Sequence, residues 1–329
     1  FASRFPGWAE ALAASQRRVA ALERTVESLS DRMSHDPALA DSMHELLTTA
    51  AAVRSTAQIL AGEGVLEREW QANLDADSQR LAQSAQALAG YLETSKGAKG
   101  AGLSAQEEVE AYLAAQDFHF PQLEGECADT LIDTLLSQAS PALSEAAQFI
   151  LRGVLEQVRS DAAALSLEEV QAGVVAEGVE PVILARRFGV PVALMLRRLA
   201  ALPQLGAGLV VCDRSGTVIF RKSIDGFSVP RFDSCCPLWP LFAALAAPGS
   251  VLRERVGQLG RGRTQFDAFA TTELATAHDY NSPAPARGVM LLVRAPAGDA
   301  SAPVRAVGAT CRICPHERCH ARREPSIMR

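Results

Sequence analysis

The chain has 329 residues, a net charge of −6 and 48% apolar residues. This apolar content excludes a wholly disordered chain, and the length allows two or three domains. No uncharged apolar run reaches the roughly 18 residues of a membrane span. With no secretory leader either, we expect a cytoplasmic protein without a membrane segment.

The charge is unevenly distributed along the chain. Residues 1–95 hold 8 basic and 13 acidic side chains, or −5, and residues 96–202 hold 8 and 15, or −7. Residues 203–329 hold 16 basic and 10 acidic side chains, or +6. An acidic front half repels phosphate, so it is not expected to contact nucleic acid. The basic C-terminal part is suited to DNA, to an anionic ligand or to the acidic half of its own chain.

Residues 1–95 are predicted to form a homodimerising helical module. Apolar side chains from Val19 to Met33 follow a 3-4-3-4 heptad spacing, and similar stripes run through residues 39–60 and 66–92. Helices with one narrow apolar stripe each can bury it by pairing, as a hairpin, with a second copy.

One segment of this module has two possible chemical interpretations. His44-Glu45-Leu46-Leu47-Thr48 is not a zincin motif, because Thr48 stands where the second histidine must lie. It also resembles the phosphoacceptor helix of a histidine kinase, but no nucleotide-binding box follows. His44 is therefore expected to be a polar helix residue, and histidine phosphotransfer is kept as an alternative function.

A flexible linker at residues 96–104 is predicted to lead into a helical domain over 105–202. Residues 181–199 have the pattern of a helix–turn–helix with its turn at Gly189. The second helix opens with Pro191 and apolar side chains, which suit packing better than groove reading. Its arginines are expected on a solvated helix face: Arg186, Arg187, Arg197 and Arg198.

Residues 203–329 are predicted to form an α+β domain. A β-hairpin over 209–220, strands at 289–293 and 304–307, and a helix at 238–247 are indicated. The fold class is therefore mainly α with a C-terminal α+β domain.

Cysteine spacing predicts a metal or cluster site in this domain. Cys311 and Cys314, separated by two residues, and Cys319 supply three thiolates that one ion or cluster could bind. Cys236 is the best candidate for the fourth ligand, with Cys235 or His320 in reserve. An iron–sulfur cluster and zinc stay equally open, and free thiols or a Cys311–Cys314 redox pair are the alternatives.

Arginines are frequent near the cysteines. They are Arg253, Arg255, Arg261, Arg263, Arg322 and Arg323. They form either a binding site for a phosphate-rich ligand, such as a coenzyme A thioester, or an arginine-rich surface. No nucleophile–base pair, paired carboxylates or phosphate-binding loop is present, so we expect no enzyme activity.

Several motifs with rare residues occur in fixed order. Residues 225–232 read Asp-Gly-Phe-Ser-Val-Pro-Arg-Phe, residues 236–242 read Cys-Pro-Leu-Trp-Pro-Leu-Phe, and residues 307–314 read Val-Gly-Ala-Thr-Cys-Arg-Ile-Cys. With Pro248-Gly249 and residues 319–325, they resemble the short-chain fatty acyl transcriptional regulators over about 120 residues.

This resemblance implies a dimeric bacterial regulator of acetate and propionate metabolism with an acyl-CoA effector. It implies DNA binding through an N-terminal helix–turn–helix domain that this sequence does not contain. It also implies a domain like the ImmA/IrrE peptidases, degenerate here because residues 146–153 hold neither histidine nor glutamate. The terminal domain is expected to be a GAF-like sensor with a four-cysteine site. A regulator that senses redox state or metal through the cysteines is the alternative function.

Overall fold

The computed structural model of the chain divides into two compact units, residues 1–102 and 103–329. It describes residues 15, 46, 48–50, 53 and 76–86 of the first unit, and residues 104–124, 130–139, 143–231, 233–260, 264–274, 285–296 and 303–327 of the second. Residues 76–86 are helical, as predicted. His44 and most of the heptad positions lie outside the described residues. None of the described helices is long and apolar enough to cross a membrane.

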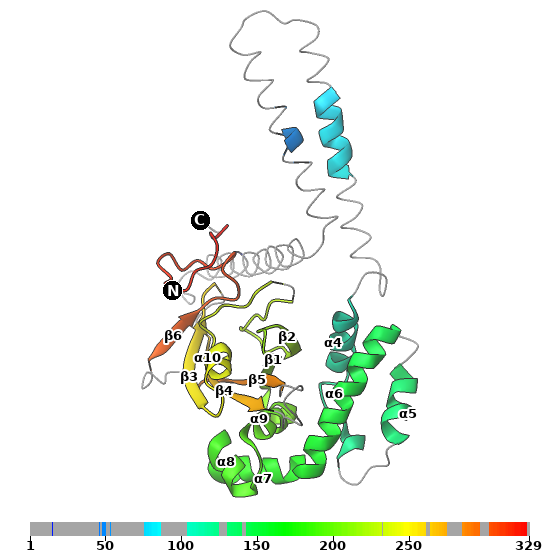
Figure 1. The fold of residues 1–329 in the computed structure, drawn as a ribbon, viewed down its shortest axis with the longest axis vertical. Helices are drawn as coiled ribbons and strands as arrows, with labels where there is room; N and C mark the ends of the chain where they lie inside the picture. Colours follow the sequence, from blue (N-terminus) through cyan, green and yellow to red (C-terminus); the bar gives the residue numbers. More distant parts are fainter. Residues whose placement is uncertain are drawn as a thin grey trace, which may run out of the picture. The chain divides into compact units, whose positions relative to one another are not determined.

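The second unit opens with three helices that share one apolar core. They are α4 (Ala105–Ala115), α5 (Thr130–Ala139) and α6 (Glu145–Ala164), with a short 3-10 helix, η1 (Pro121–Leu123), between α4 and α5. In the capping box of α4, the Ser104 hydroxyl accepts the N–H of Glu107, and the Glu107 carboxylate accepts the N–H of Ser104. Figure 1 shows α4 and α6 beside the edge of the sheet formed by β2, with α5 farther from the sheet.

Three further helices follow: α7 (Leu167–Glu177), α8 (Pro181–Phe188) and α9 (Val192–Ala201). Gly189 ends α8 with a φ of 66°, a left-handed conformation that favours glycine. The predicted helix–turn–helix is thus confirmed. Leu196 and Leu199 of its second helix are fully buried, so that helix is a packing element, as predicted, and its core includes side chains of the sheet.

The expectation of a solvated helix face is wrong for two of the four arginines. The side chains of Arg197 and Arg198 are only 13% and 2% exposed, and both form ion pairs. Their carboxylate partners lie far away in sequence, so the local pattern does not reveal them. Arg186 and Arg187 are exposed, as expected.

A six-stranded sheet forms the rest of the unit, in the order β2-β1-β5-β4-β3-β6. The neighbouring strands are antiparallel except for the parallel pair β3 and β6. The strands are β1 (Gly208–Cys212), β2 (Val218–Lys222), β3 (Val251–Gln258), β4 (Gln265–Leu274), β5 (Ala286–Arg294) and β6 (Val304–Val307). The predicted hairpin is β1 and β2, the two further predicted strands are β5 and β6, and the predicted helix is α10 (Pro240–Ala246).

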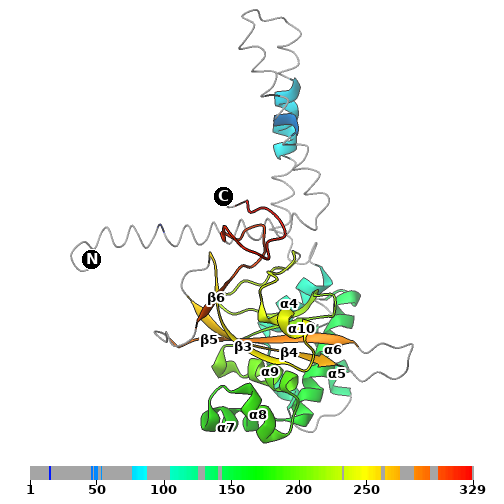
Figure 2. The same ribbon diagram turned by 60° about the vertical axis from the view of Figure 1, so that its left-hand side comes forward.

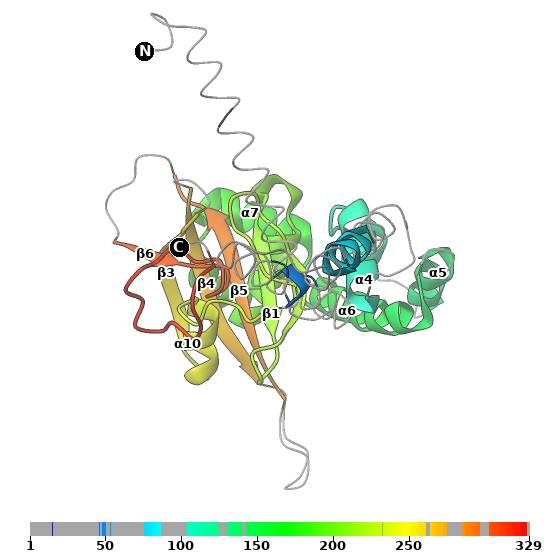
Figure 3. The same ribbon diagram turned by 90° about the horizontal axis from the view of Figure 1, so that it is seen from above.

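Side chains of the central strands alternate between two cores, as the period of a strand requires. Leu209 and Val211 of β1 face the core that contains α9, whereas Val210 and Cys212 face the core that contains α10. Figures 2 and 3 show the sheet between these two layers, with α7 and α10 on opposite faces. Two sites follow from this arrangement: a cysteine pocket on the α10 side and a cavity on the α9 side.

Candidate functional site

The cysteine pocket joins two segments that are distant in sequence, the loop before α10 and the tail after β6. The backbone N–H of Cys236 donates to the carbonyl of Ala309 over 2.8 Å. The buried indole of Trp239 donates to the carbonyl of Gly308 over the same distance. These bonds hold Cys236 against the tail that carries the other three predicted ligands.

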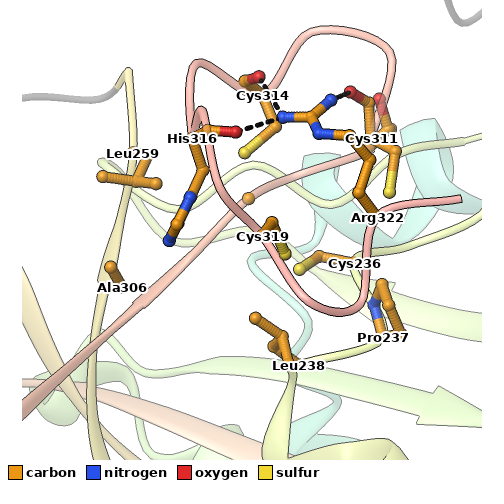
Figure 4. A pocket seen from close by; sticks show the side chains of 12 residues that line it. Cys236, Pro237, Leu238, Leu259, Ala306, Cys311, Cys314, His316, Cys319 and Arg322 are labelled. Atoms are coloured by element: carbon orange, nitrogen blue, oxygen red, sulfur yellow. Dashed lines mark hydrogen bonds between the residues drawn. The ribbon is translucent and has the colours of Figure 1, made fainter. Parts of the chain in front are cut away.

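Arg322 holds the tail in a loop. Its guanidinium donates to the carbonyls of Cys311, Cys314 and His316 at 3.0, 3.1 and 2.5 Å (Figure 4). Arg323 likewise donates to the carbonyls of Ser234 and Cys235. Both guanidiniums were expected near an anionic ligand; here they satisfy backbone carbonyls and fix the shape of the pocket.

The structure brings all four predicted metal ligands to one pocket. Cys236, Cys311 and Cys314 are buried, Cys319 is half-buried, and His316 lies beside them (Figure 4). The reserve candidates, Cys235 and His320, do not line the pocket. Its free volume is about 10 Å³, roughly the space of one water-sized sphere.

The donor chemistry of this pocket suits a thiophilic metal, because cysteine sulfur binds zinc and iron–sulfur clusters. Within the described ranges, however, no three histidine, cysteine or acidic side chains are close enough together to hold one ion. Burial raises the pKa of the Cys236 thiol, and the neighbouring Cys314 and Cys311 raise it further, whereas backbone N–H groups lower it. The metal therefore stays a prediction that requires the sulfurs to move closer together.

The second site is a cavity of about 550 Å³ between α6, α9, the edge strand β2 and its neighbour β1. Aromatic and aliphatic side chains form much of its wall: Phe118, Phe120, Phe149, Ile150, Val154, Val158, Leu209, Val211, Ile219 and Phe220. A volume of this size is typical of small-molecule sites. Phe149 is 80% exposed, so the cavity has an apolar rim open to solvent.

An ion-pair network connects the helices and the sheet on one side of the cavity. Arg197 makes two bonds to Asp161 of α6, at 2.6 and 2.9 Å, and two to Glu273 at the end of β4, at 3.0 and 3.2 Å. Arg198 pairs with Glu124 at 2.5 Å. These carboxylates neutralise their partners, so this side of the cavity offers little net charge to a ligand.

Two other cations of the cavity have no carboxylate within ion-pair distance in the described part of the chain. They are Lys222, the last residue of β2, and Arg287, near the start of β5. In the strand register, Lys222 of β2 and Leu291 of β5 are both opposite Leu209 of β1. Leu291 is four residues from Arg287, so the two cations are separated by roughly 14 Å along the strand direction. An elongated anion can span that distance.

Backbone strain occurs at the rim of the cavity beside Lys222. Asp117 and Phe118 have φ values of 51° and 54°, which non-glycine residues rarely adopt. This conformation places the Phe118 ring 5.8 Å from the Lys222 ammonium and edge-on to Phe220. Strain of this kind is frequent at ligand sites.

Of the four arginines predicted to hold a phosphate-rich ligand, the structure describes two, Arg253 and Arg255. Arg255 is buried and makes two bonds to Asp267. Arg253 pairs with Glu180 at 2.8 Å and lies over the ring of Phe269. Arg261 and Arg263 lie outside the described residues. Neither Arg253 nor Arg255 lines the cavity, which sequence analysis missed because the described wall comes from seven separate segments.

Residues 204–329 match the family model described as "Short-chain fatty acyl coenzyme A regulator, C-terminal". The resemblance predicted from the sequence is therefore confirmed for the C-terminal domain, which carries the cysteine pocket and the β-strands of the cavity.

Curated relatives are transcription regulators and a regulator of a carboxylase. The chain is 30% identical over 158 residues to the propionyl-CoA carboxylase regulator of Cereibacter sphaeroides, covering 44% of this chain and 34% of the relative. It is 30% identical over 172 residues to the HTH-type transcriptional regulator PrpR of Mycobacterium tuberculosis, covering 44% and 33%. The match to RamB of the same organism is 29% over 130 residues, covering 36% and 27%. The matched regions span about a third or less of these relatives.

A solved structure of a Mycobacterium tuberculosis transcriptional regulator has a similar fold. It superposes with a TM-score of 0.50 at 22% identity, covering 68% of this chain and 69% of that one. At this identity, the likeness supports the fold alone.

Proposed function

We propose that this chain is the effector-sensing and dimerisation part of a bacterial transcription regulator of short-chain acyl-CoA metabolism, and that it is not an enzyme. The match of residues 204–329 to the acyl-CoA regulator family supports this function. The names of the relatives, which concern propionyl-CoA carboxylase and transcription, point the same way.

The observation that carries the proposal is the cavity on the α9 side of the sheet. Its apolar wall suits a short acyl chain, while Lys222 and Arg287 suit the anionic groups and carbonyl of a coenzyme A thioester. We therefore place the effector there rather than at Arg253 and Arg255, whose guanidiniums already pair with Glu180 and Asp267. A GAF-like character of the terminal domain stays part of this proposal.

Calorimetry with acetyl-CoA, propionyl-CoA and free coenzyme A tests the effector site. Replacing Arg287 by Gln should weaken binding about tenfold, because a charge-assisted bond contributes about 1.5–3 kcal/mol. The matched control is Arg253→Gln, an arginine outside the cavity, which should leave the affinity unchanged. If Arg253→Gln weakened binding and Arg287→Gln did not, the effector site would lie at the predicted arginine group instead. If no thioester bound, the sensing proposal would be wrong.

We also propose that Cys236, Cys311, Cys314 and Cys319 hold zinc or an iron–sulfur cluster, either as a structural support or as the sensor itself. Bound metal would cross-link the loop before α10 to the C-terminal tail. Elemental analysis and visible absorption of anaerobically purified protein distinguish the two metals. Cys314→Ser should lower the metal content, whereas Cys212→Ala, outside the pocket, should not. Metal-free, colourless protein would reject this site.

Dimerisation through residues 1–95 and DNA binding through a separate helix–turn–helix domain complete the proposal. In a dimer, an effector can change the spacing at which two DNA-binding domains are held. Light scattering of the chain with and without residues 1–95 tests the dimer. Promoter binding by a longer protein that includes the upstream segment, with and without propionyl-CoA, tests the output. Phosphotransfer at His44 gains no support from the described residues.

A further inference from the structure

The cavity contains a chemically unusual residue for this chain. The sequence has 29 arginines but only three lysines, Lys96, Lys99 and Lys222. Lys222 is therefore the only lysine of the second unit, and it lines the cavity. An arginine there would supply a cation but no nucleophile, because a guanidinium stays protonated in proteins.

We propose that Lys222 is a self-acylation site, modified by the acyl thioester that binds in the cavity. This inference rests on the proposed function, because it requires a thioester at that position. It adds a covalent step to reversible sensing, because the acyl group would stay bound to the chain after coenzyme A has dissociated.

The position of the amine supports nucleophilic attack. Nζ of Lys222 lies 2.5 Å from the carbonyl oxygen of Ala200, near the C-terminal end of α9, and 5.8 Å from the centroid of the Phe118 ring. A neutral amine can donate an N–H to that carbonyl and keep its lone pair directed to a ligand. The aromatic and aliphatic wall at this end of the cavity, Phe118 and Leu209 included, suits the acyl end of the thioester.

The charge balance around Lys222 agrees with this role. No carboxylate lies within ion-pair distance of Nζ among the described residues, and burial lowers the pKa of the amine, although the charge of Asp117 raises it. Each unit of lowering gives about tenfold more free amine at neutral pH. Arg287, at the far end of the cavity, forms no ion pair among the described residues, because its cross-strand neighbour Glu273 pairs with Arg197, and it can hold the anionic part of the same molecule.

The reaction is an aminolysis. The Nζ lone pair attacks the thioester carbonyl carbon, a C–N bond forms, and the C–S bond breaks. Coenzyme A leaves as its thiolate and takes up the proton that the nitrogen loses, so that amine and thioester become amide and thiol. No oxidant, reductant or metal is required. Acylation removes the positive charge beside Phe118 and fills part of the cavity.

The experiment incubates the full chain with propionyl-CoA and maps acylated lysines by peptide mass spectrometry while released thiol is measured. We expect Lys222 to be acylated at least about tenfold faster than Lys96 and Lys99, because a bound thioester is held beside the amine. Lys222→Arg should abolish the single-site label. The matched control, Lys96→Arg with Lys99→Arg, should still release one thiol per chain. S-propionyl-N-acetylcysteamine, which lacks the nucleotide, should lose the preference for Lys222.

A second measurement separates this inference from the proposed function. The unreactive thioether S-propyl-CoA reports binding without acyl transfer. If it binds but propionyl-CoA labels the three lysines equally or not at all, self-acylation is wrong and effector binding stands. If neither compound binds, both proposals fail. Thermal unfolding of the Lys222→Arg variant verifies that loss of label does not come from loss of fold.

Discussion

The indole N–H of Trp239 donates a hydrogen bond of 2.8 Å to the carbonyl oxygen of Gly308. Trp239 precedes α10, and Gly308 follows β6, so this bond links the two segments that carry the pocket cysteines. The indole is fully buried and lies 5.1 Å from the ring of Phe227. The Trp239 side chain thus both packs in the core on the α10 side and satisfies the carbonyl of Gly308, which lines the pocket.

Replacing Trp239 by Phe keeps an aromatic ring but removes the donor. We expect a loss of about 1–3 kcal/mol in the free energy of unfolding, since a buried carbonyl loses its main partner. Urea unfolding measures this loss. Trypsin should also cleave after Arg312 and Arg318 faster than in the wild type, because the tail is less firmly held. A change below about 0.5 kcal/mol would show that the bond contributes nothing to stability.

Gly308 is also constrained by the pocket. A Cβ atom at this position would lie 2.9 Å from the sulfur of Cys314, closer than such atoms approach. Gly308→Ala should therefore displace Cys314 and destabilise the protein by about 1–3 kcal/mol. The matched substitution is Gly153→Ala in the middle of α6, where a Cβ meets nothing within 4 Å. It should stabilise the helix by about 0.5–1 kcal/mol. Equal effects of the two variants would contradict the steric argument.

Local patterns were sufficient for much of the fold. The β-hairpin of β1 and β2 has its own turn residues, Asp213 to Gly216, and α9 has a nearly continuous apolar sequence. β3 and β4 were not predicted. In β3, three consecutive charged side chains, Arg253 to Arg255, obscure the strand character. Spacing grouped Cys311, Cys314 and Cys319, and Cys236 was added as the best candidate for a fourth ligand. The distances between the four sulfurs could not be predicted from the sequence.

The cavity could not be predicted, because its chemistry depends on contacts between distant residues. Lys222 meets a carbonyl of α9 and the ring of Phe118, which are separated by 22 and 104 positions in the sequence. The one available signal was compositional: a single lysine in an arginine-rich domain. The burial of Arg197 likewise depends on carboxylates of α6 and β4, which no local pattern indicates.

The ion pairs of Arg197 hold α6, α9 and β4 together beside the cavity, and their contribution to stability can be measured. Replacing Arg197 by Ala leaves the carboxylates of Asp161 and Glu273 without their cation, and Asp161 is only 5% exposed. We expect a loss of about 3–5 kcal/mol in urea unfolding, the usual cost of breaking a buried pair. Arg152→Ala breaks an exposed pair with Asp133 and should cost less than about 1 kcal/mol. Similar costs for both would mean that the network is not shielded from water.

Thiol reactivity should differ sharply between two cysteines. Burial raises the pKa of Cys212 to about 11, whereas Cys319 is half-buried at the pocket. The thiolate is the reactive form, so Cys212 should resist iodoacetamide at pH 8 in the folded chain. In metal-free protein, mass spectrometry over time should show Cys319 labelled before Cys212, with both equally labelled in urea. Early labelling of Cys212 in the native protein would indicate that the α10 side of the sheet opens readily.

The pH dependence of stability gives an independent measure of the environment of Lys222. Its pKa is lowered in the folded chain, chiefly by burial, from an ordinary value of 10.5. Between the lowered value and 10.5 the unfolded chain binds more protons, so this residue makes stability rise with pH in that window. Lys222→Met removes this dependence. The free energy of unfolding of the wild type minus that of the variant should therefore increase as pH rises toward 10.5, whatever its value at pH 7. Parallel curves would mean that the amine is solvated as in the unfolded chain, and would remove the enrichment of free amine on which rapid acylation depends.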